Sequence, residues 1–233
     1  MSIIFATMNN MLINPVYNAL LTRDAGLGFG TDTVRSFDEE VSPFVGFGEE
    51  NQKGFEELAD LLPVSRKIIY AKPSRIVEPR HWKISVQMAG LQFVYEGVGV
   101  PPRPSVMLTR LQSSHVEEMV QLAMLTKPGP FNTRTIEFGN YHGVFDDGKL
   151  VAMAGQRMHP GPYTEISAVC THPEHLGKGY AAALITHQLE SILDEGNKPF
   201  LHVRADNERA VALYLRLGFK VSREMNFYFM KRK

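Results

Sequence analysis

The second half of the chain alternates between short apolar runs and amphipathic stretches in a regular order. The apolar runs predict strands at 106–111, 164–171 and 199–205. Apolar positions at helical spacing predict helices over 113–126, 177–195 and 206–218. A hairpin is predicted around Asp146-Asp147-Gly148, and a strand pair or one bent strand after Gly218. This order predicts a mixed α/β sheet with helices on its faces.

The helices are each expected to bury one face. In the first, Ser113 or Ser114 is the expected cap, and the buried face is expected to hold Val116, Met119, Val120 and Met124. In the second, the apolar face holds Ala181, Ile185, Leu189, Ile192 and Leu193, and Gly196 closes the helix.

The first half has a similar rhythm without a clear chemical motif. Helices are predicted near 15–22 and 51–63, and strands near 42–47, 66–72 and 83–97. Between the halves, residues 97–106 hold three prolines within four positions, which disfavours both helix and central strand. We therefore predict an N-terminal α/β domain of unassigned role at 1–104 and a second domain at 105–233. The shared rhythm permits the first to be a degenerate copy of the second.

Composition narrows the class of protein. Lys+Arg and Asp+Glu both number 25 in 233 residues, so no net charge attracts the chain to nucleic acid or to an anionic membrane. Cys170 is the only cysteine, which excludes an internal disulfide and fits a reducing compartment. The apolar start has no Lys or Arg before Arg23 and is interrupted by Pro15, unlike a signal peptide or membrane span. A cytoplasmic protein is expected, without nucleic-acid or membrane partners.

The candidate chemistry begins at the turn "EHLGKG", residues 174–179, between a predicted strand and a predicted helix. Unpaired amides and the helix dipole make such a turn suitable for a phosphate, and glycines allow close approach. A tight turn without a ligand is the alternative. His172 and His175 do not complete a metal-ligand set with nearby residues, so no metal is expected. Cys170 fits a small buried residue better than a nucleophile.

A second motif follows about 30 residues downstream. Residues 207–219 read N-x-x-A-x-x-L-Y-x-x-x-G-F, with Asn207, Ala210 and Tyr214 on one helical face. Together, the two motifs resemble the signatures of the GNAT superfamily of acetyl-CoA-dependent N-acetyltransferases over residues 105–233. Two positions depart from the family pattern: Glu174 stands where Gln or Arg is usual, and Leu176 replaces a frequent basic residue.

The resemblance implies a mostly antiparallel central sheet flanked by helices and direct transfer of an acetyl group from acetyl-CoA to a primary amine. It places Val169, Cys170 and Thr171 along the pantetheine, with an amide of Val169 or Cys170 as oxyanion donor. It places the amides from Leu176 through Gly177, Lys178, Gly179 and Tyr180 to Ala181 on the pyrophosphate, and Asn207 and Tyr214 on the cofactor.

The resemblance also implies catalytic roles. Tyr214 is the expected proton donor to the CoA thiolate, and a core tyrosine is the alternative. Glu165 is the candidate base, because strand alternation would place Glu165, Ser167, Val169 and Thr171 on one face; an exposed strand charge is the alternative.

Other functions stay open at this point. A non-catalytic CoA-binding sensor or interaction module is the main alternative, and a nucleotide or phosphosugar binder is the third. The amine acceptor and the oligomeric state, monomer or homodimer, are not determined. The first half is expected to supply part of the acceptor pocket, because it is the part that the minimal fold lacks.

Overall fold

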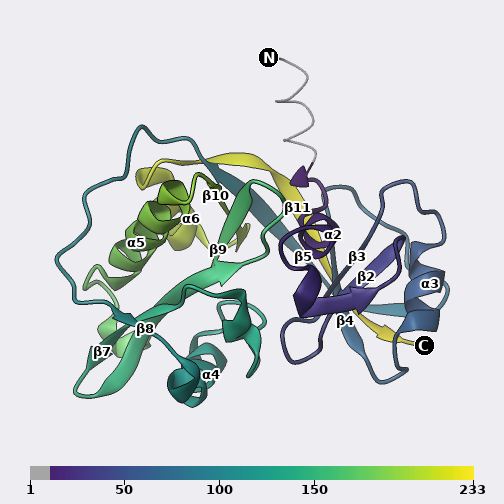
Figure 1. The fold of residues 1–233 in the computed structure, drawn as a ribbon, viewed down its shortest axis with the longest axis horizontal. Coiled ribbons are helices and arrows are strands. Elements are labelled where there is room, and N and C mark those ends of the chain that lie inside the picture. Colours follow the sequence, from purple (N-terminus) through teal and green to yellow (C-terminus); the bar gives the residue numbers. More distant parts are fainter. Residues whose placement is uncertain (1–10) are drawn as a thin grey trace.

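A computed structural model describes residues 11–233, which form one sheet of eleven strands with helices against it (Figure 1). The order across the sheet is β1-β2-β3-β4-β11-β5-β10-β9-β8-β7-β6. The strands are β1 (Gly28–Gly30), β2 (Val34–Phe37), β3 (Phe44–Phe47), β4 (Lys67–Lys72), β5 (Trp82–Tyr95), β6 (Thr109–Arg110), β7 (His142–Asp146), β8 (Lys149–Arg157), β9 (Tyr163–Thr171), β10 (Lys198–Arg204) and β11 (Phe219–Arg232). Neighbouring strands are antiparallel except for β3–β4 and β9–β10. The predicted mixed, mostly antiparallel sheet is confirmed.

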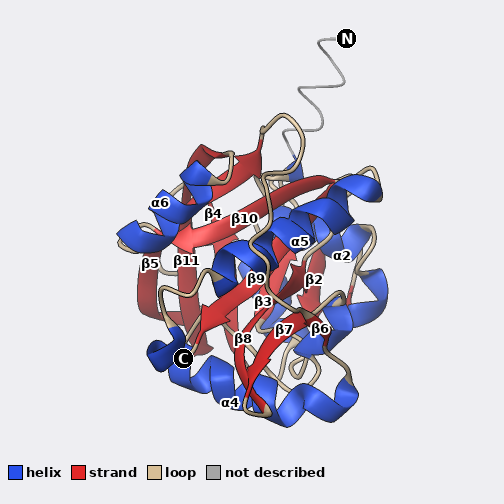
Figure 2. Cartoon of the chain, turned by 90° about the vertical axis from the view of Figure 1, so that its left-hand side faces the viewer, coloured by secondary structure: helices blue, strands red, loops and turns tan. Residues whose placement is uncertain are grey.

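The helices cover both faces of this sheet (Figure 2). They are α2 (Pro15–Leu21), α3 (Gly54–Leu61), α4 (Val116–Thr126), α5 (Tyr180–Asp194) and α6 (Glu208–Arg216), with 3₁₀ turns at Ala25–Leu27, Ser113–His115, Thr135–Phe138 and Pro173–His175. One apolar cluster joins α4 to the side of β8 and β9 that carries Met153 and Cys170. Two others join α5 and α6 to the opposite side, where Ala152 and Ile166 lie. No described helix is long and apolar enough to cross a membrane.

The two halves of the chain follow the same strand pattern about the centre of the sheet. On one side, β3 runs parallel to β4 with α3 between them in sequence; on the other, β9 runs parallel to β10 with α5 between them. The central strands are exchanged: β5, from the first half, pairs with β10, while β11, from the second half, pairs with β4. Sheet pairing thus continues across the predicted boundary at residue 104, and the division into two domains stays a prediction.

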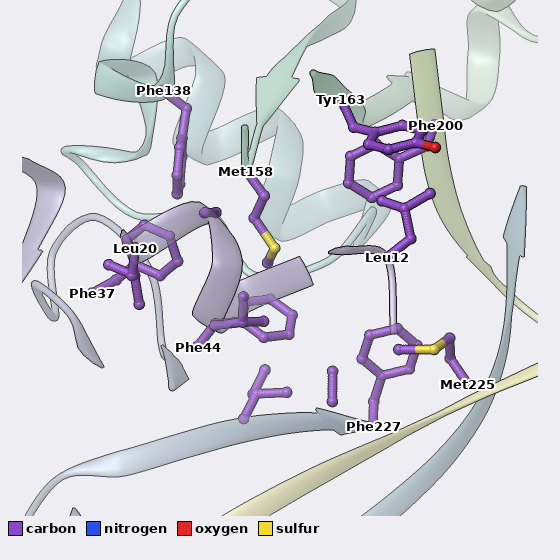
Figure 3. Packing of buried hydrophobic residues seen from close by; sticks show 14 of the residues in the cluster. Leu12, Leu20, Phe37, Phe44, Phe138, Met158, Tyr163, Phe200, Met225 and Phe227 are labelled. Carbon is purple, nitrogen blue, oxygen red and sulfur yellow. The ribbon is translucent and has the colours of Figure 1, made fainter. Parts of the chain in front are cut away.

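The core also spans both halves (Figure 3). Leu12, Leu20 and Phe44 from the first half lie in one buried cluster with Met158 and Phe200 from the second. Each of these side chains is at most 3% exposed. Full burial of such a side chain contributes about 1.5–3 kcal/mol. The packing of this shared core therefore joins the two halves in addition to the strand pairing.

Several local expectations were wrong. The cap of the first helical segment is Gln112, whose side chain accepts from the backbone of His115 while the His115 ring accepts from the backbone of Gln112. Helix α4 buries Met119, Leu122 and Ala123, whereas Met124 is exposed. The buried face is set by tertiary packing, because Met119, Leu122 and Ala123 are the residues that contact the side of β8 and β9 that carries Met153 and Cys170. Strands β1 and β2 were missed. The segment after Gly218 agrees with one of its two predicted alternatives, because it is one long strand with two irregularities.

Candidate functional site

The site is a gap that opens where β9 and β10 separate. The two strands pair in parallel only from Tyr163 to Glu165 on β9. Beyond Glu165 the strands diverge, and a cavity of about 290 Å³ is lined by residues 166–171 of β9 and by His202, Val203 and Arg204 of β10. Backbone groups on the diverging edges have no strand partner across this gap, which leaves them available to an extended ligand.

A bulge in β9 re-aims the side chains along the gap. Ala168 has a positive φ of 54°, and the β8–β9 register shifts by one residue between Gly155↔Ser167 and Met153↔Cys170. Because a bulge changes the parity of the strand, Glu165 and Ser167 share a face with Cys170, opposite Thr171. The expected single face of Glu165, Ser167, Val169 and Thr171 was therefore wrong.

A second cavity, of about 510 Å³, continues the gap toward the start of α5. The two cavities share six lining residues: Val169, Cys170, Thr171, Asn207, Ala210 and Tyr214. The second cavity adds Leu176, Gly177, Gly179, Tyr180 and Ala181 from the turn. The structure thus brings the two sequence motifs together on one continuous channel.

The turn before α5 presents unpaired amides to this channel. Gly177 and Gly179 adopt left-handed conformations, with φ of 83° and 80°. The first backbone hydrogen bond of the helix runs from Ala183 to Gly179, so the amides of residues 177–182 have no backbone partner within the described chain. Such an arrangement binds an anion, because the helix dipole adds positive potential to the free donors. The Lys178 side chain turns aside toward Asp146 and His175.

Helix α6 places two cations beside the turn. Arg209 and Arg216, seven residues apart on one helical face, both line the second cavity. Leu176 is half-exposed and brings no charge, and the Lys178 side chain is directed to Asp146, so these arginines add positive charge to the cavity. The sequence signal was present as an i, i+7 pair on the helix of the second motif, but the motif does not include these positions.

Asn207 and Tyr214 project from α6 at the junction of the two cavities. Asn207 caps the helix, its Oδ1 accepting from the amide of Ala210 at 3.1 Å. Tyr214 packs against Phe93 and Phe219, with ring centroids 6.0 and 5.9 Å away. Its hydroxyl makes no hydrogen bond within the described chain, and burial raises the pKa of Tyr214 well above its ordinary value. The phenol is therefore protonated at neutral pH and available to donate into the channel.

Glu165 lies beneath the gap in a buried ion network. Arg157 donates to both carboxylate oxygens, from Nε at 2.9 Å and from Nη2 at 2.8 Å. Nδ1 of His202 lies 2.7 Å from Oε1. Burial alone would raise the pKa of this carboxyl, but the attraction of Arg157 and the hydrogen bonds of both partners outweigh it and lower the pKa to about 2. The predicted role of Glu165 as a base stays untested, and these surroundings make its carboxylate a weak proton acceptor.

His202 and Arg157, which the sequence motifs did not single out, connect this network to the cavity. Both line the gap, whereas Glu165 does not. Nε2 of His202 lies 3.0 Å from the amide nitrogen of Gln92, which also donates to the carbonyl of Leu12. The amide therefore donates to the ring, and Nδ1 carries the proton that meets Glu165. No motif marks either residue, because the contacts join side chains on three different strands and depend on how those strands pair.

Comparison with known proteins fixes the family. A solved structure from Novosphingobium aromaticivorans DSM 12444, assigned to the GNAT family, is 32% identical and has a TM-score of 0.88. The alignment covers 95% of this chain and 98% of that one. The chain belongs to the GNAT family. A GCN5-related N-acetyltransferase from Kribbella flavida shares the fold of this GNAT protein, with 15% identity, a TM-score of 0.61 and coverage of 92% and 95% of the two chains.

The family model and the curated relatives each match only part of this GNAT protein. Residues 141–228 match the FR47-like protein family. The mycothiol acetyltransferase of Paenarthrobacter aurescens (strain TC1) is 38% identical over 79 residues, and that of Mycobacterium sp. (strain JLS) is 37% identical over 86. These matches cover 31% and 34% of this chain but only 24% and 29% of those proteins. The match to these curated relatives thus spans about a quarter of their length.

The structure also shows the surroundings of Cys170 and of the two histidines near the turn. Cys170 is buried against α4, and burial raises the pKa of its thiol to about 11, which disfavours a nucleophilic thiolate. Possible ligand atoms of His172, Glu174 and His175 lie within 4.8 Å of one another beside the turn. The expected absence of a metal stays a prediction.

Proposed function

We propose that this GNAT protein transfers the acetyl group of acetyl-CoA to a primary amine by direct attack in a ternary complex. One observation carries the proposal: a single channel joins the unpaired amides of residues 177–182, the open edge of β9 and the Tyr214 hydroxyl. A pyrophosphate, an extended pantetheine arm and a thioester require these three elements in this order. The family uses acetyl-CoA as co-substrate, and the residues present fit it.

In the proposed reaction the neutral amine attacks the thioester carbonyl carbon from the side of the gap opposite the turn before α5. A carbon–nitrogen bond forms while the carbonyl oxygen gains negative charge, which an amide of Val169 or Cys170 stabilises. The carbon–sulfur bond then breaks, and the Tyr214 hydroxyl gives its proton to the departing thiolate. The amine nitrogen releases its extra proton to solvent, and Tyr214 is reprotonated.

Glu165 has a positioning role in this proposal. Its carboxylate fixes the guanidinium of Arg157 and the ring of His202, which both line the cavity between β9 and β10. Its low pKa keeps the carboxylate charged near neutral pH. The amine must then arrive deprotonated or lose its proton to water. The acidic limb of the pH–rate profile would report the amine, not Glu165.

Thiol release with a panel of amines tests the proposal directly. Acetyl-CoA plus an accepted amine should release free CoA and yield an acetylated product of matching mass. Thermal stabilisation by acetyl-CoA and not by ATP should accompany it, because the channel is shaped for a pantetheine arm. Stabilisation without thiol release from any amine would favour a non-catalytic CoA sensor, and stabilisation by ATP alone would favour a nucleotide binder.

The setting of the reaction is part of the same proposal. The balanced charge and the single cysteine support a cytoplasmic enzyme without nucleic-acid or membrane partners, and a monomer or homodimer is part of the proposal.

A further inference from the structure

A third cavity, of about 630 Å³, extends the channel beyond the acetyl position. It lies between β4 and β11 on one side and the loop after α4 on the other. We call the cavity of about 290 Å³ between β9 and β10 the reaction cavity. The third cavity shares five lining residues with it: Ile69, Lys127, Gly129, Pro130 and Phe229. We call the combined space beyond the gap the acceptor groove, because the CoA channel approaches the gap from the opposite end.

Strand β11 gives the length of this groove. Phe227 lines only the reaction cavity, Phe229 lines both cavities, and Lys231 lines only the third. Alternate residues of a strand point to one face and each residue advances about 3.3 Å, so the groove follows β11 for about 13 Å. This length corresponds to about four residues of an extended chain.

The floor of the groove is apolar and its far end is cationic. Ile68, Ile69 and Phe131 line the third cavity, and Met124, which is 71% exposed, lies at its edge. Three lysines also line it, namely Lys67, Lys127 and Lys231. Neither this cavity nor the reaction cavity is lined by an acidic residue within the described chain.

Two of these lysines oppose each other without compensation. Lys67 is the direct cross-strand partner of Lys231 in the β4–β11 pair. None of the three lysines of the groove has an ion pair with another described residue. Like charges directly opposite in a sheet destabilise it. An anionic group bound between them would offset that repulsion.

We propose that the acceptor is the N-terminal amine of a polypeptide whose first residues are apolar and whose fourth and fifth residues are acidic. This inference rests on the proposed function. The amine lies at the gap, the first side chains pack on Ile69 and Phe229, and the carboxylates meet Lys67 and Lys231. A free amino acid is too short to join the gap to these lysines, and a polyamine would be repelled by them.

Two matched pentapeptides test this proposal. They share three apolar N-terminal residues and end in either two glutamates or two lysines; a version with an acetylated N-terminus is the blank. The wild-type protein should favour the acidic peptide by about tenfold in kcat/KM, the effect of two partly exposed charge pairs. The double variant Lys67→Glu/Lys231→Glu should reverse this preference, and the gain with the basic peptide shows that the variant is folded.

The matched control is Lys53→Glu, an exposed lysine at the start of α3 that lines none of the three cavities. It should keep the wild-type preference. A kcat/KM ratio near one in the wild-type protein, or a ratio that the double variant does not change, would overturn the proposal. Higher kcat/KM with single amino acids than with the acidic peptide would overturn it too.

A binding measurement separates this inference from the proposed function. Fluorescence anisotropy of C-terminally labelled peptides on the CoA-saturated protein reports the charge preference without turnover. Preferential binding of the acidic peptide with no thiol release from any amine would overturn the acetyl-transfer proposal and, with it, the acceptor role of the peptide. Thiol release from small amines with no peptide preference would overturn the peptide proposal alone.

Discussion

Replacing Glu165 with Gln distinguishes two possible roles of this residue, a catalytic base and a positioning group. The substitution keeps the shape of the side chain but leaves the Arg157 guanidinium buried without its counter-charge. Breaking one partner of a buried ion pair costs about 3–5 kcal/mol. The pKa gives a similar figure: a carboxyl lowered from 4.5 to about 2 by its partners contributes about 3 kcal/mol of stability at neutral pH.

The expected loss is measurable by two methods. For a chain of this size each kcal/mol shifts the unfolding temperature by about 2–4 °C, so Glu165→Gln should lower it by about 10 °C. Urea unfolding should show the same loss of unfolding free energy. It can be monitored by the fluorescence of Trp82, the only tryptophan, which is fully buried at the start of β5.

The chain contains a matched control for this experiment. Arg134 and Glu137 form the same two-pronged pair, at 2.6 and 3.0 Å, on the surface. Because exposed pairs are screened by solvent, Glu137→Gln should leave the unfolding temperature almost unchanged. Equal effects of the two substitutions would refute the importance of burial in this reasoning.

The pH dependence gives a further check, and its sign follows from the lowered pKa. Stability from Glu165 is fully present above about pH 4.5 and is lost as the pH falls toward 2. The difference in unfolding free energy between the wild-type and Glu165→Gln proteins should therefore become smaller in acid. In the rate profile, the acidic limb should survive in the variant; its disappearance would restore Glu165 as the base.

Three other variants test the remaining roles. Tyr214→Phe should lower kcat by roughly 10–10⁴-fold with an amine for which chemistry is rate-limiting, while isothermal calorimetry shows acetyl-CoA still binding; an unchanged kcat would remove the hydroxyl from the mechanism. The double variant Arg209→Gln/Arg216→Gln should raise KM for acetyl-CoA and weaken its dependence on salt, and no change in either would leave the pyrophosphate to the turn amides alone. Cys170→Ala should keep kcat within a few-fold, and mass spectrometry should find the wild-type thiol resistant to iodoacetamide near pH 8, because its pKa is raised to about 11; rapid alkylation would contradict its burial.

The sequence was most informative where a local motif corresponds to a local structure. The turn with Gly177 and Gly179, the cap at Asn207 and the helix that carries Tyr214 are all set by neighbours within a few residues. Such features follow from backbone conformation and helical spacing, so the amino-acid sequence alone sufficed to predict the turn and the helix on the cofactor side of the site.

The sequence was least informative where distant strands meet. Strand alternation misplaced Glu165 relative to Thr171 because the bulge at Ala168 has no sequence signature: alanine rarely adopts a positive φ. The ion network of Arg157, Glu165 and His202 joins three strands, and its register depends on the whole sheet. Strands β1 and β2 were missed because they are only three and four residues long, and two of the three residues of β1 are glycines.

The exchange of β5 and β11 gives the polypeptide a property that a simple two-part chain lacks. A break in the exposed proline-rich stretch at 97–106 would leave β5 on one fragment and its partners β10 and β11 on the other. The hydrogen bonds of those strands and the shared core would still join the pieces. The two fragments, expressed as separate chains, would therefore assemble into a split protein, and the proposed acetyl transfer would depend on their association.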